Sequence, residues 1–164
     1  MKTVKGNLID LAEQGEFDVI VQGCNCFCTM GSGIAREIRH RYPNAYTVDL
    51  ATLEGDYNKL GTFTMSPANL DREQSKFLIV NAYTQYGFNR GQERDDLFEY
   101  VSFAMILQKL AFMQAEHVPN GRFGFPKIGC GLAGGDEDRI MQHLQFFSEV
   151  IAAEGGTVTV VEFE

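Results

Sequence analysis

Two glycine-rich stretches hold the residues of this chain that are best placed to bind a ligand. The first, residues 22–35, follows a short apolar run at 17–21 that is typical of a buried strand. The second, residues 127–135, follows another strand-like run at 122–126. Each stretch leads into a sequence with helical periodicity, so both have the order strand, glycine-rich turn, helix.

A turn of this kind leaves backbone N–H groups at the start of a helix without partners, which suits an anion such as a diphosphate. Glycines also let a ligand approach the backbone closely. Neither stretch fits G-x-G-x-x-G or G-x-x-x-x-G-K-[ST], so the two best-known nucleotide fingerprints are excluded. One such stretch is equally well explained as a plain turn. Two stretches at the same edge of an α/β sheet favour a phosphate held between two sets of donors.

The composition predicts one globular domain over residues 1–164, with 45% hydrophobic and 22% charged residues. A formal net charge of −8 disfavours a broad basic surface for nucleic acid, so local dipoles must hold any anionic ligand. No N-terminal signal pattern is present, and the apolar runs are too short to span a membrane. We therefore expect a cytoplasmic protein without a membrane partner.

The four cysteines are expected to be structural. Cys24, Cys26 and Cys28 alternate along the chain, and Cys130 lies in the second glycine-rich stretch. Neighbours this close in sequence cannot form unstrained disulfides, and zinc sites use wider spacing. Small buried side chains lining a loop are the stronger interpretation, and redox or metal chemistry the weaker one. We expect neither a metal ion nor a cofactor.

The order of elements predicts a three-layer α/β sandwich with ligands at the carboxyl ends of the central strands. The long helix is predicted to be capped by Asp95 and Asp96. Its four-residue spacing is marked by Leu97, Val101, Met105 and Gln108. Predicted strands cover residues 3–7, 17–21, 60–66, 76–83, 122–126 and 157–163, and predicted helices cover 8–13, 33–41, 45–53, 95–115 and the segment between 136–138 and 155.

Four segments together resemble the macrodomain family, the ADP-ribose-binding fold. They are residues 5–8, 24–26, 30–35 and 126–132, and the resemblance extends over essentially the whole chain. It is greatest to the branch that holds yeast-type ADP-ribose-1″-phosphate phosphatases and the terminal ADP-ribose protein glycohydrolases. The resemblance implies an α/β/α sandwich with a central mixed sheet, and ADP-ribose or a derivative as the ligand.

Carried over to this sequence, the family pattern gives each segment a part of the ligand. Asn7 would accept a hydrogen bond from the adenine amino group, and the end of the last strand would close over the adenine. Asn25 would bind the distal ribose, and the two glycine-rich stretches would hold the diphosphate. The ligand-binding residues implied in this way are Asn7, Leu8, Gln22, Asn25, Gly31, Ser32, Gly33, Ile34, Gly129, Cys130, Gly131, Leu132, Ala133 and Phe163.

Three departures from the family bear on catalysis. The glycohydrolase lysine is missing from residues 81–85, and Ala133 replaces the glycohydrolase aspartate, so a lysine nucleophile is unsupported. Gln22 stands where the phosphatases have a histidine, and a glutamine cannot transfer a proton near neutral pH. Asp136 is the nearest carboxylate that can replace these groups, although its position also suits a helix N-cap.

Two classes of function follow from the resemblance. In the first, the protein hydrolyses an ADP-ribose derivative by removing its 1″-phosphate, with Asn25 and Asp136 as catalytic residues. Asn25 would orient the ribose, and either Asp136 or the substrate's own phosphate would activate the attacking water. In the second, it is a module that binds ADP-ribose without turnover, as the missing acid and base groups suggest. Removal of ADP-ribose from protein or nucleic acid is a further alternative. A stand-alone domain favours the enzyme.

Overall fold

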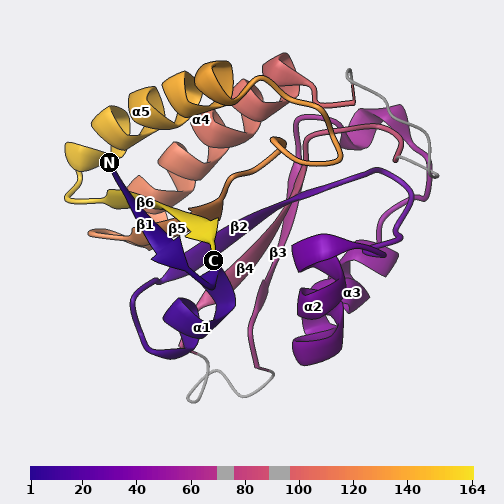
Figure 1. Cartoon of the computed structure of the whole chain (residues 1–164), viewed down its shortest axis with the longest axis horizontal. Helices are drawn as coiled ribbons and strands as arrows, with labels where there is room; N and C mark the ends of the chain where they lie inside the picture. Colours follow the sequence, from indigo (N-terminus) through magenta and orange to yellow (C-terminus); the bar gives the residue numbers. More distant parts are fainter. Residues whose placement is uncertain (70–75, 89–96) are drawn as a thin grey trace.

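A six-stranded mixed sheet runs through the centre of the molecule, with helices on both faces (Figure 1). The computed structural model describes residues 1–69, 76–88 and 97–164. Its strands, in the spatial order β1-β6-β5-β2-β4-β3, are β1 Lys2–Gly6, β2 Val19–Cys24, β3 Phe63–Pro67, β4 Leu78–Tyr83, β5 Arg122–Pro126 and β6 Thr157–Phe163. The helices are α1 Leu8–Glu13, α2 Gly33–Arg41, α3 Pro43–Leu50, the 3-10 turn η1 Tyr57–Lys59, α4 Tyr100–His117 and α5 Glu137–Ala152.

Five of the six strands are parallel, and β3 pairs with β4 in the antiparallel sense. The carboxyl ends of β1, β2, β4, β5 and β6 therefore meet at one edge of the sheet. The predicted α/β/α sandwich with a central mixed sheet is confirmed. None of the helices in the described ranges is both long enough and apolar enough to cross a bilayer.

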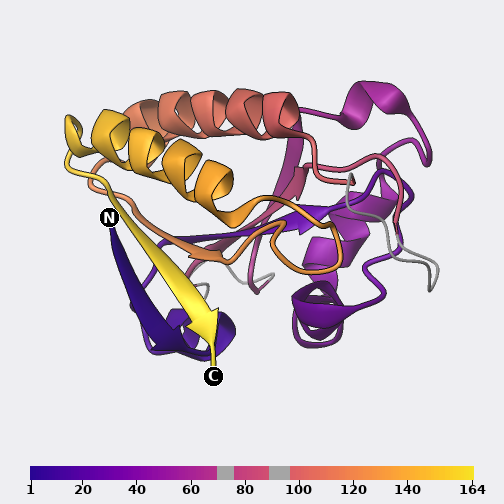
Figure 2. The same ribbon diagram turned by 45° about the horizontal axis from the view of Figure 1, so that its top comes forward.

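The two helical layers bury separate clusters of apolar side chains. Helices α4 and α5 cover one face of the sheet, and α1, α2 and α3 cover the other (Figures 1 and 2). On the α4/α5 face, Phe103, Leu110 and Phe125 belong to the larger cluster. Ile38 and Ile79 belong to the cluster on the opposite face. Both faces of the central strands are thus removed from water, as expected for a parallel sheet.

Strand β2 is longer than its apolar run predicts. The run ends at Val21, but ladder pairing continues through Gln22 and Gly23 to Cys24. Gln22 is fully buried, and its Nε2 donates to Asn81 Oδ1 at 2.8 Å. Asn81 in turn donates to the backbone oxygen of Ala45 in α3. A polar side chain therefore continues the strand because its partner lies in register on the neighbouring strand.

Helix ends follow the capping rules at most positions. Asn7 and Asp136 cap α1 and α5 by accepting hydrogen bonds from backbone N–H groups, and Pro43 begins α3. Helix α4 is an exception to the prediction, because it begins at Tyr100 after the N-cap Glu99. Asp95 and Asp96, the predicted caps, lie outside the described residues.

The apolar spacing assigned to α4 also proved wrong. Val101 and Met105 are exposed, whereas Phe103, Ile106 and Leu110 are buried. Leu97 precedes the helix and is buried against the core. The helix is apolar around most of its circumference, so its sequence does not define which side faces the sheet.

An ion pair fixes the amino-terminal edge of the sheet. Arg122, the first residue of β5, donates from Nη2 to Asp18 Oδ1 at 2.9 Å and from Nε to Asp18 Oδ2 at 3.0 Å. Its Nη1 donates to the backbone oxygen of Gly15. The hydrogen bonds from Arg122 hold the pKa of Asp18 below its ordinary value, against the opposing effect of burial.

We predict that Asp18→Asn lowers the free energy of unfolding by about 1 kcal/mol at pH 7, because the bidentate bond is charge-assisted but partly exposed. A lowered pKa in the folded state means that this stabilisation is present above the unfolded pKa of Asp, about 3.9, and is lost as the pH falls through the folded value. Urea unfolding at pH 7 and pH 3 measures the difference. An equal difference at both pH values would contradict the assignment.

Candidate functional site

Two adjacent cavities lie at the carboxyl edge of the sheet. The larger has a volume of about 550 Å³ and is bordered by the loops that follow β2, β4 and β5. The smaller, of about 420 Å³, lies between the ends of β1 and β6 and the start of α2. Gly33, Ile34 and Pro126 line both cavities. The two cavities therefore adjoin each other along the sheet edge.

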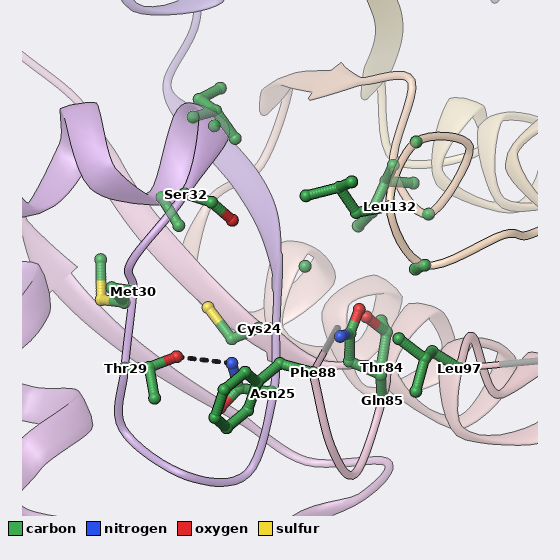
Figure 3. Close-up of a pocket in the computed structure, with 18 of the residues that line it drawn as sticks. Cys24, Asn25, Thr29, Met30, Ser32, Thr84, Gln85, Phe88, Leu97 and Leu132 are labelled. Atoms are coloured by element: carbon green, nitrogen blue, oxygen red, sulfur yellow. Dashed lines mark hydrogen bonds between the residues drawn. The ribbon is translucent and has the colours of Figure 1, made fainter. Parts of the chain in front are cut away.

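The first glycine-rich loop is folded by the side chain of Asn25. Its Oδ1 accepts a hydrogen bond from the backbone N–H of Phe27, and its Nδ2 donates to Thr29 Oγ1 at 2.7 Å (Figure 3). An asparagine side chain has two N–H donors, so one remains for a ligand. Asn25 thus both shapes the loop and presents a donor to the larger cavity, which it lines.

The second loop requires glycine at positions 129 and 135. Gly129 has φ +75°, and a Cβ there would lie 2.3 Å from the ring of Phe98. A Cβ at Gly135 would lie 2.7 Å from the backbone oxygen of Gly129, which accepts the hydrogen bond from the N–H of Gly135 that closes the loop. Lys127 ties the loop to its surroundings through ion pairs of 3.0 Å with Glu137 and Glu162. These contacts hold the loop in place before any ligand binds.

Unpaired backbone amides from both loops border the larger cavity. The first turn of α2 leaves the N–H groups of Gly33, Ile34 and Ala35 without helical partners. Among the described residues, the N–H groups of Gly131, Leu132 and Ala133 in the second loop also make no hydrogen bond. Figure 3 shows Ser32, from the first loop, and Leu132, from the second, on opposite sides of the opening. The two loops thus form a candidate anion-binding site, with backbone N–H donors on two sides of the cavity.

The glycines of the two loops leave open space for a ligand. An added Cβ at Gly33 or Gly131 would meet no atom within 4 Å. Gly33 has φ +56°, in the left-handed region that favours glycine, whereas Gly131 has no such constraint. Both residues line the larger cavity, so their missing side chains enlarge it.

The smaller cavity contains the residues expected at the adenine end. Asn7, Leu8 and Phe163 line it together with Glu37. Asn7 Oδ1 already accepts hydrogen bonds from the N–H groups of Ile9 and Asp10 as the cap of α1. The side chain of Asn7 therefore offers its amide N–H groups to a ligand more readily than its oxygen, in contrast to the expected acceptor role.

Three of the residues expected in the site line neither cavity. Gln22 is buried within β2 and bonded to Asn81, so the prediction that it contacts the ligand is not supported by its position. Cys130 turns its thiol back toward the oxygen of Ile128. Asp136 Oδ1 accepts from the N–H of Arg139, and its backbone N–H donates to Tyr100 Oη. The capping interpretation of Asp136 fits this geometry.

Sequence reasoning missed the contribution of the loop after β4. Thr84, Gln85 and Phe88 line the larger cavity, and so does Leu97. Because β4 is the neighbour of β2 in the sheet, its carboxyl end had to border the same site. Strand order, which the sequence does not give directly, was the missing information.

Asp49 is another residue of the cavity wall that sequence reasoning missed. It lies in α3 and is only 1% exposed. Tyr83 Oη donates to Asp49 Oδ1 at 2.7 Å, and the ammonium group of Lys59 lies 4.7 Å from the centre of the Tyr83 ring. Burial raises the pKa of Asp49, while the hydrogen bond from Tyr83 and the charge of Lys59 oppose that shift.

Three of the four cysteines are buried, as predicted. Burial raises the pKa of Cys24, and it raises the pKa of Cys26 to about 11. Cys28 donates from its thiol to the backbone oxygen of Asp49. In residues 1–69, 76–88 and 97–164, no group of three or more acidic, cysteine or histidine side chains is arranged to hold a metal ion.

The chain is 31% identical over 149 residues to the "Uncharacterized 17.5 kDa protein in tk-vs intergenic region" of Enterobacteria phage T4. The match covers 90% of each of the two chains. No family model matches the sequence.

Several solved structures share the fold at low sequence identity. A protein of unknown function from Bacteroides thetaiotaomicron superposes with a TM-score of 0.74 at 22% identity, covering 98% of this chain and 96% of the other. The macrodomain of Mycobacterium tuberculosis DarG superposes with 0.73 at 19% identity, covering 98% and 95%. A Trypanosoma brucei macrodomain in complex with ADP-ribose gives 0.66 at 14% identity, covering 98% and 62%. These superpositions establish the macrodomain fold.

We predict that Cys130 is the first thiol to react with an aromatic disulfide reagent in the native protein. It is partly exposed, whereas Cys26 and Cys28 are buried and Cys24 is buried in the wall of the larger cavity. The measurement is a stopped-flow titration of wild type and Cys130→Ala, with denatured protein as the reference for four thiols. A fast phase that persists in Cys130→Ala would show that one of the other three is accessible.

Proposed function

The chain belongs to the family of the phage T4 tk-vs protein and has the macrodomain fold, and on this basis we propose that it binds ADP-ribose and removes the 1″-phosphate from ADP-ribose-1″-phosphate. The observation that carries the proposal is the pair of amide sets facing each other across the larger cavity. Backbone donors of this kind bind phosphate oxygens without a basic side chain. This suits a protein with a net charge of −8.

The two cavities allow the parts of an ADP-ribose molecule to be assigned to positions along the site. The diphosphate would lie between the start of α2 and the second loop, where the unpaired amides converge. The adenine would occupy the smaller cavity beside Asn7 and Phe163. The distal ribose would then extend into the larger cavity, toward Asn25 and the loop after β4.

In the proposed reaction, the second N–H of Asn25 orients the distal ribose. Its first N–H is held by Thr29, and its oxygen is held by Phe27, so the side chain is fixed before the substrate arrives. Fixed groups lower the entropic cost of reaching the reactive geometry. The loop amides stabilise the charge that develops on the phosphate.

A binding module without turnover is the second candidate. The specific observation in its favour is that Asp136 caps α5 and does not reach the cavity, which removes the carboxylate expected to activate water. A hydrolase that removes ADP-ribose from protein or nucleic acid is a further alternative. Separate measurement of phosphate release and ADP-ribose release, from the 1″-phosphate and from ADP-ribosylated protein, distinguishes these functions.

We predict that ADP-ribose binds more tightly than AMP, and that Gly131→Val weakens its binding by tenfold or more, because the new side chain fills cavity space without backbone strain. Gly33→Val is expected to abolish binding, because it also forces a β-branched residue to φ +56°. Isothermal calorimetry measures both effects.

Gly15→Val is the matched control for these glycine variants. Gly15 has φ +88° with no atom near its Cβ position, and it lies at the opposite edge of the sheet. Its substitution introduces comparable strain and should leave ADP-ribose affinity unchanged. Equal affinity for AMP and ADP-ribose, or unaltered binding by Gly131→Val, would contradict the placement of the diphosphate.

We predict that Asn25→Ala lowers turnover of ADP-ribose-1″-phosphate by roughly a hundredfold, because the reacting ribose loses its fixed donor. Thr29→Val, which removes the partner of Asn25 Nδ2 but keeps the asparagine, should have a smaller effect. Asp136→Asn should retain most activity, because Asn caps a helix nearly as well as Asp. Phosphate release under saturating substrate measures all three. Full activity of Asn25→Ala would refute the proposed role.

A further inference from the structure

Among the described residues that line the larger cavity, Asp49 is the only one with a carboxyl side chain. The other ionisable side chains in the wall are Cys24 and Lys127. Lys127 is engaged by Glu137 and Glu162, and burial raises the pKa of Cys24, which keeps it a neutral thiol. A positioned side chain that gives and takes a proton speeds the hydrolysis of a phosphate ester. By its position, Asp49 is the candidate for this group.

The local sequence rules do not explain a carboxylic acid at position 49. Asp49 lies in the last turn of α3, where the helix dipole disfavours a negative charge. It is 1% exposed, and it makes no ion pair with any residue that the structure describes. Burial, helix position and lack of an ion pair each cost stability. Residues that violate local rules in this way are expected at functional positions.

The surroundings of Asp49 control which form of its carboxyl group is present. The titratable and charged groups near it are Tyr83 on β4, Lys59 in η1, Cys24 at the end of β2, and Cys26 and Cys28 in the first loop. Tyr83 Oη donates to Oδ1, so a proton on the carboxyl group belongs on Oδ2. Lys59 does not pair with the carboxylate. Its Nζ instead donates to the backbone oxygen of Cys26 at 3.1 Å and lies 3.5 Å from Cys28 Sγ.

Burial raises the pKa of Asp49 and outweighs the opposing influence of Tyr83 and Lys59. An acid in this state donates a proton at a higher pH than an exposed aspartate does. It also approaches a negatively charged phosphate without the repulsion that a carboxylate would meet. The neutral form of Asp49 is therefore compatible with a phosphate ester in the same cavity.

We propose that Asp49 is the proton-transfer residue of the hydrolysis, an inference that rests on the proposed phosphatase function. Water attacks the phosphorus of the 1″-phosphate as the bond from phosphorus to the ribose oxygen breaks. The carboxylic acid donates its proton to that departing oxygen, which becomes the 1″-hydroxyl group. The carboxylate left behind takes the proton released by the attacking water. The products are ADP-ribose and inorganic phosphate, and Asp49 ends in its starting form.

The first test compares Asp49→Asn with wild type and with Asp18→Asn. Asparagine keeps the shape of the side chain and can still accept from Tyr83, but it has no proton to transfer. We expect Asp49→Asn to lower kcat at least a hundredfold and to leave the Kd for ADP-ribose within a few-fold of wild type. Asp18→Asn, at the far edge of the sheet, makes the same chemical change with no effect on kcat. Thermal melting confirms that each variant is folded.

The second test uses the pH profile and does not depend on the stability of Asp49→Asn. If Asp49 acts as an acid, kcat falls as the pH rises through its pKa in the complex. Tyr83→Phe removes the hydrogen bond that lowers this pKa, so the descending limb should move to higher pH while activity remains. A purely structural role for the Asp49–Tyr83 contact would leave the limb where it is.

The outcomes separate this inference from the function on which it rests. If wild type turns over the substrate and Asp49→Asn does so equally well, the role of Asp49 is overturned and the phosphatase function is kept. The same holds if Tyr83→Phe leaves the descending limb of the kcat–pH profile unmoved. ADP-ribose binding without phosphate release by wild type overturns both the phosphatase and the role of Asp49, and leaves the binding module. Loss of kcat in Asp49→Asn together with a shifted limb in Tyr83→Phe supports the assignment.

Discussion

Burial of both faces of the two central strands is the constraint on which the rest of this structure depends. Strands β2 and β4 bury apolar side chains on both faces, and helices cover each face (Figure 2), so no polar ligand can approach these strands from above or below. The chain can expose polar groups to a ligand only where these strands end. Because five strands run in the same direction, their carboxyl ends meet, and the loops that follow them converge on one site.

The sequence allowed the fold and the two walls of the site to be predicted because both depend on local signals. Apolar runs, the glycine-rich turns and the cap at Asp136 are readable in short windows. The limits of β2 and the start of α4 could not be predicted in this way, since they depend on partners distant in sequence. Gln22 continues the strand because Asn81 lies beside it in register, and α4 has no single apolar stripe to define its phase.

The part of the site that escaped prediction consists of residues whose role depends on tertiary contacts. Thr84 and Gln85 come to the cavity through the pairing of β4 with β2. Asp49 comes to it because α3 packs beside β4, where Tyr83 meets the carboxyl group. In the sequence, Asp49 is one acidic residue within an ordinary helical segment. Only its burial, and the hydrogen bond that it accepts from the hydroxyl group of Tyr83, distinguish it from the acidic residues at the surface.

The buried polar groups beneath the first loop also connect stability with chemistry. Lys59 is 6% exposed, and its ammonium group is satisfied by the oxygen of Cys26 and the thiol of Cys28, so it fixes the loop that presents Asn25. The same lysine places a positive charge near Asp49 without pairing with it. A direct ion pair would lower the pKa of Asp49, whereas the charge of Lys59 at this distance only partly offsets burial, which still raises that pKa. One buried lysine therefore acts on both the loop that presents Asn25 and the carboxyl group in the cavity wall.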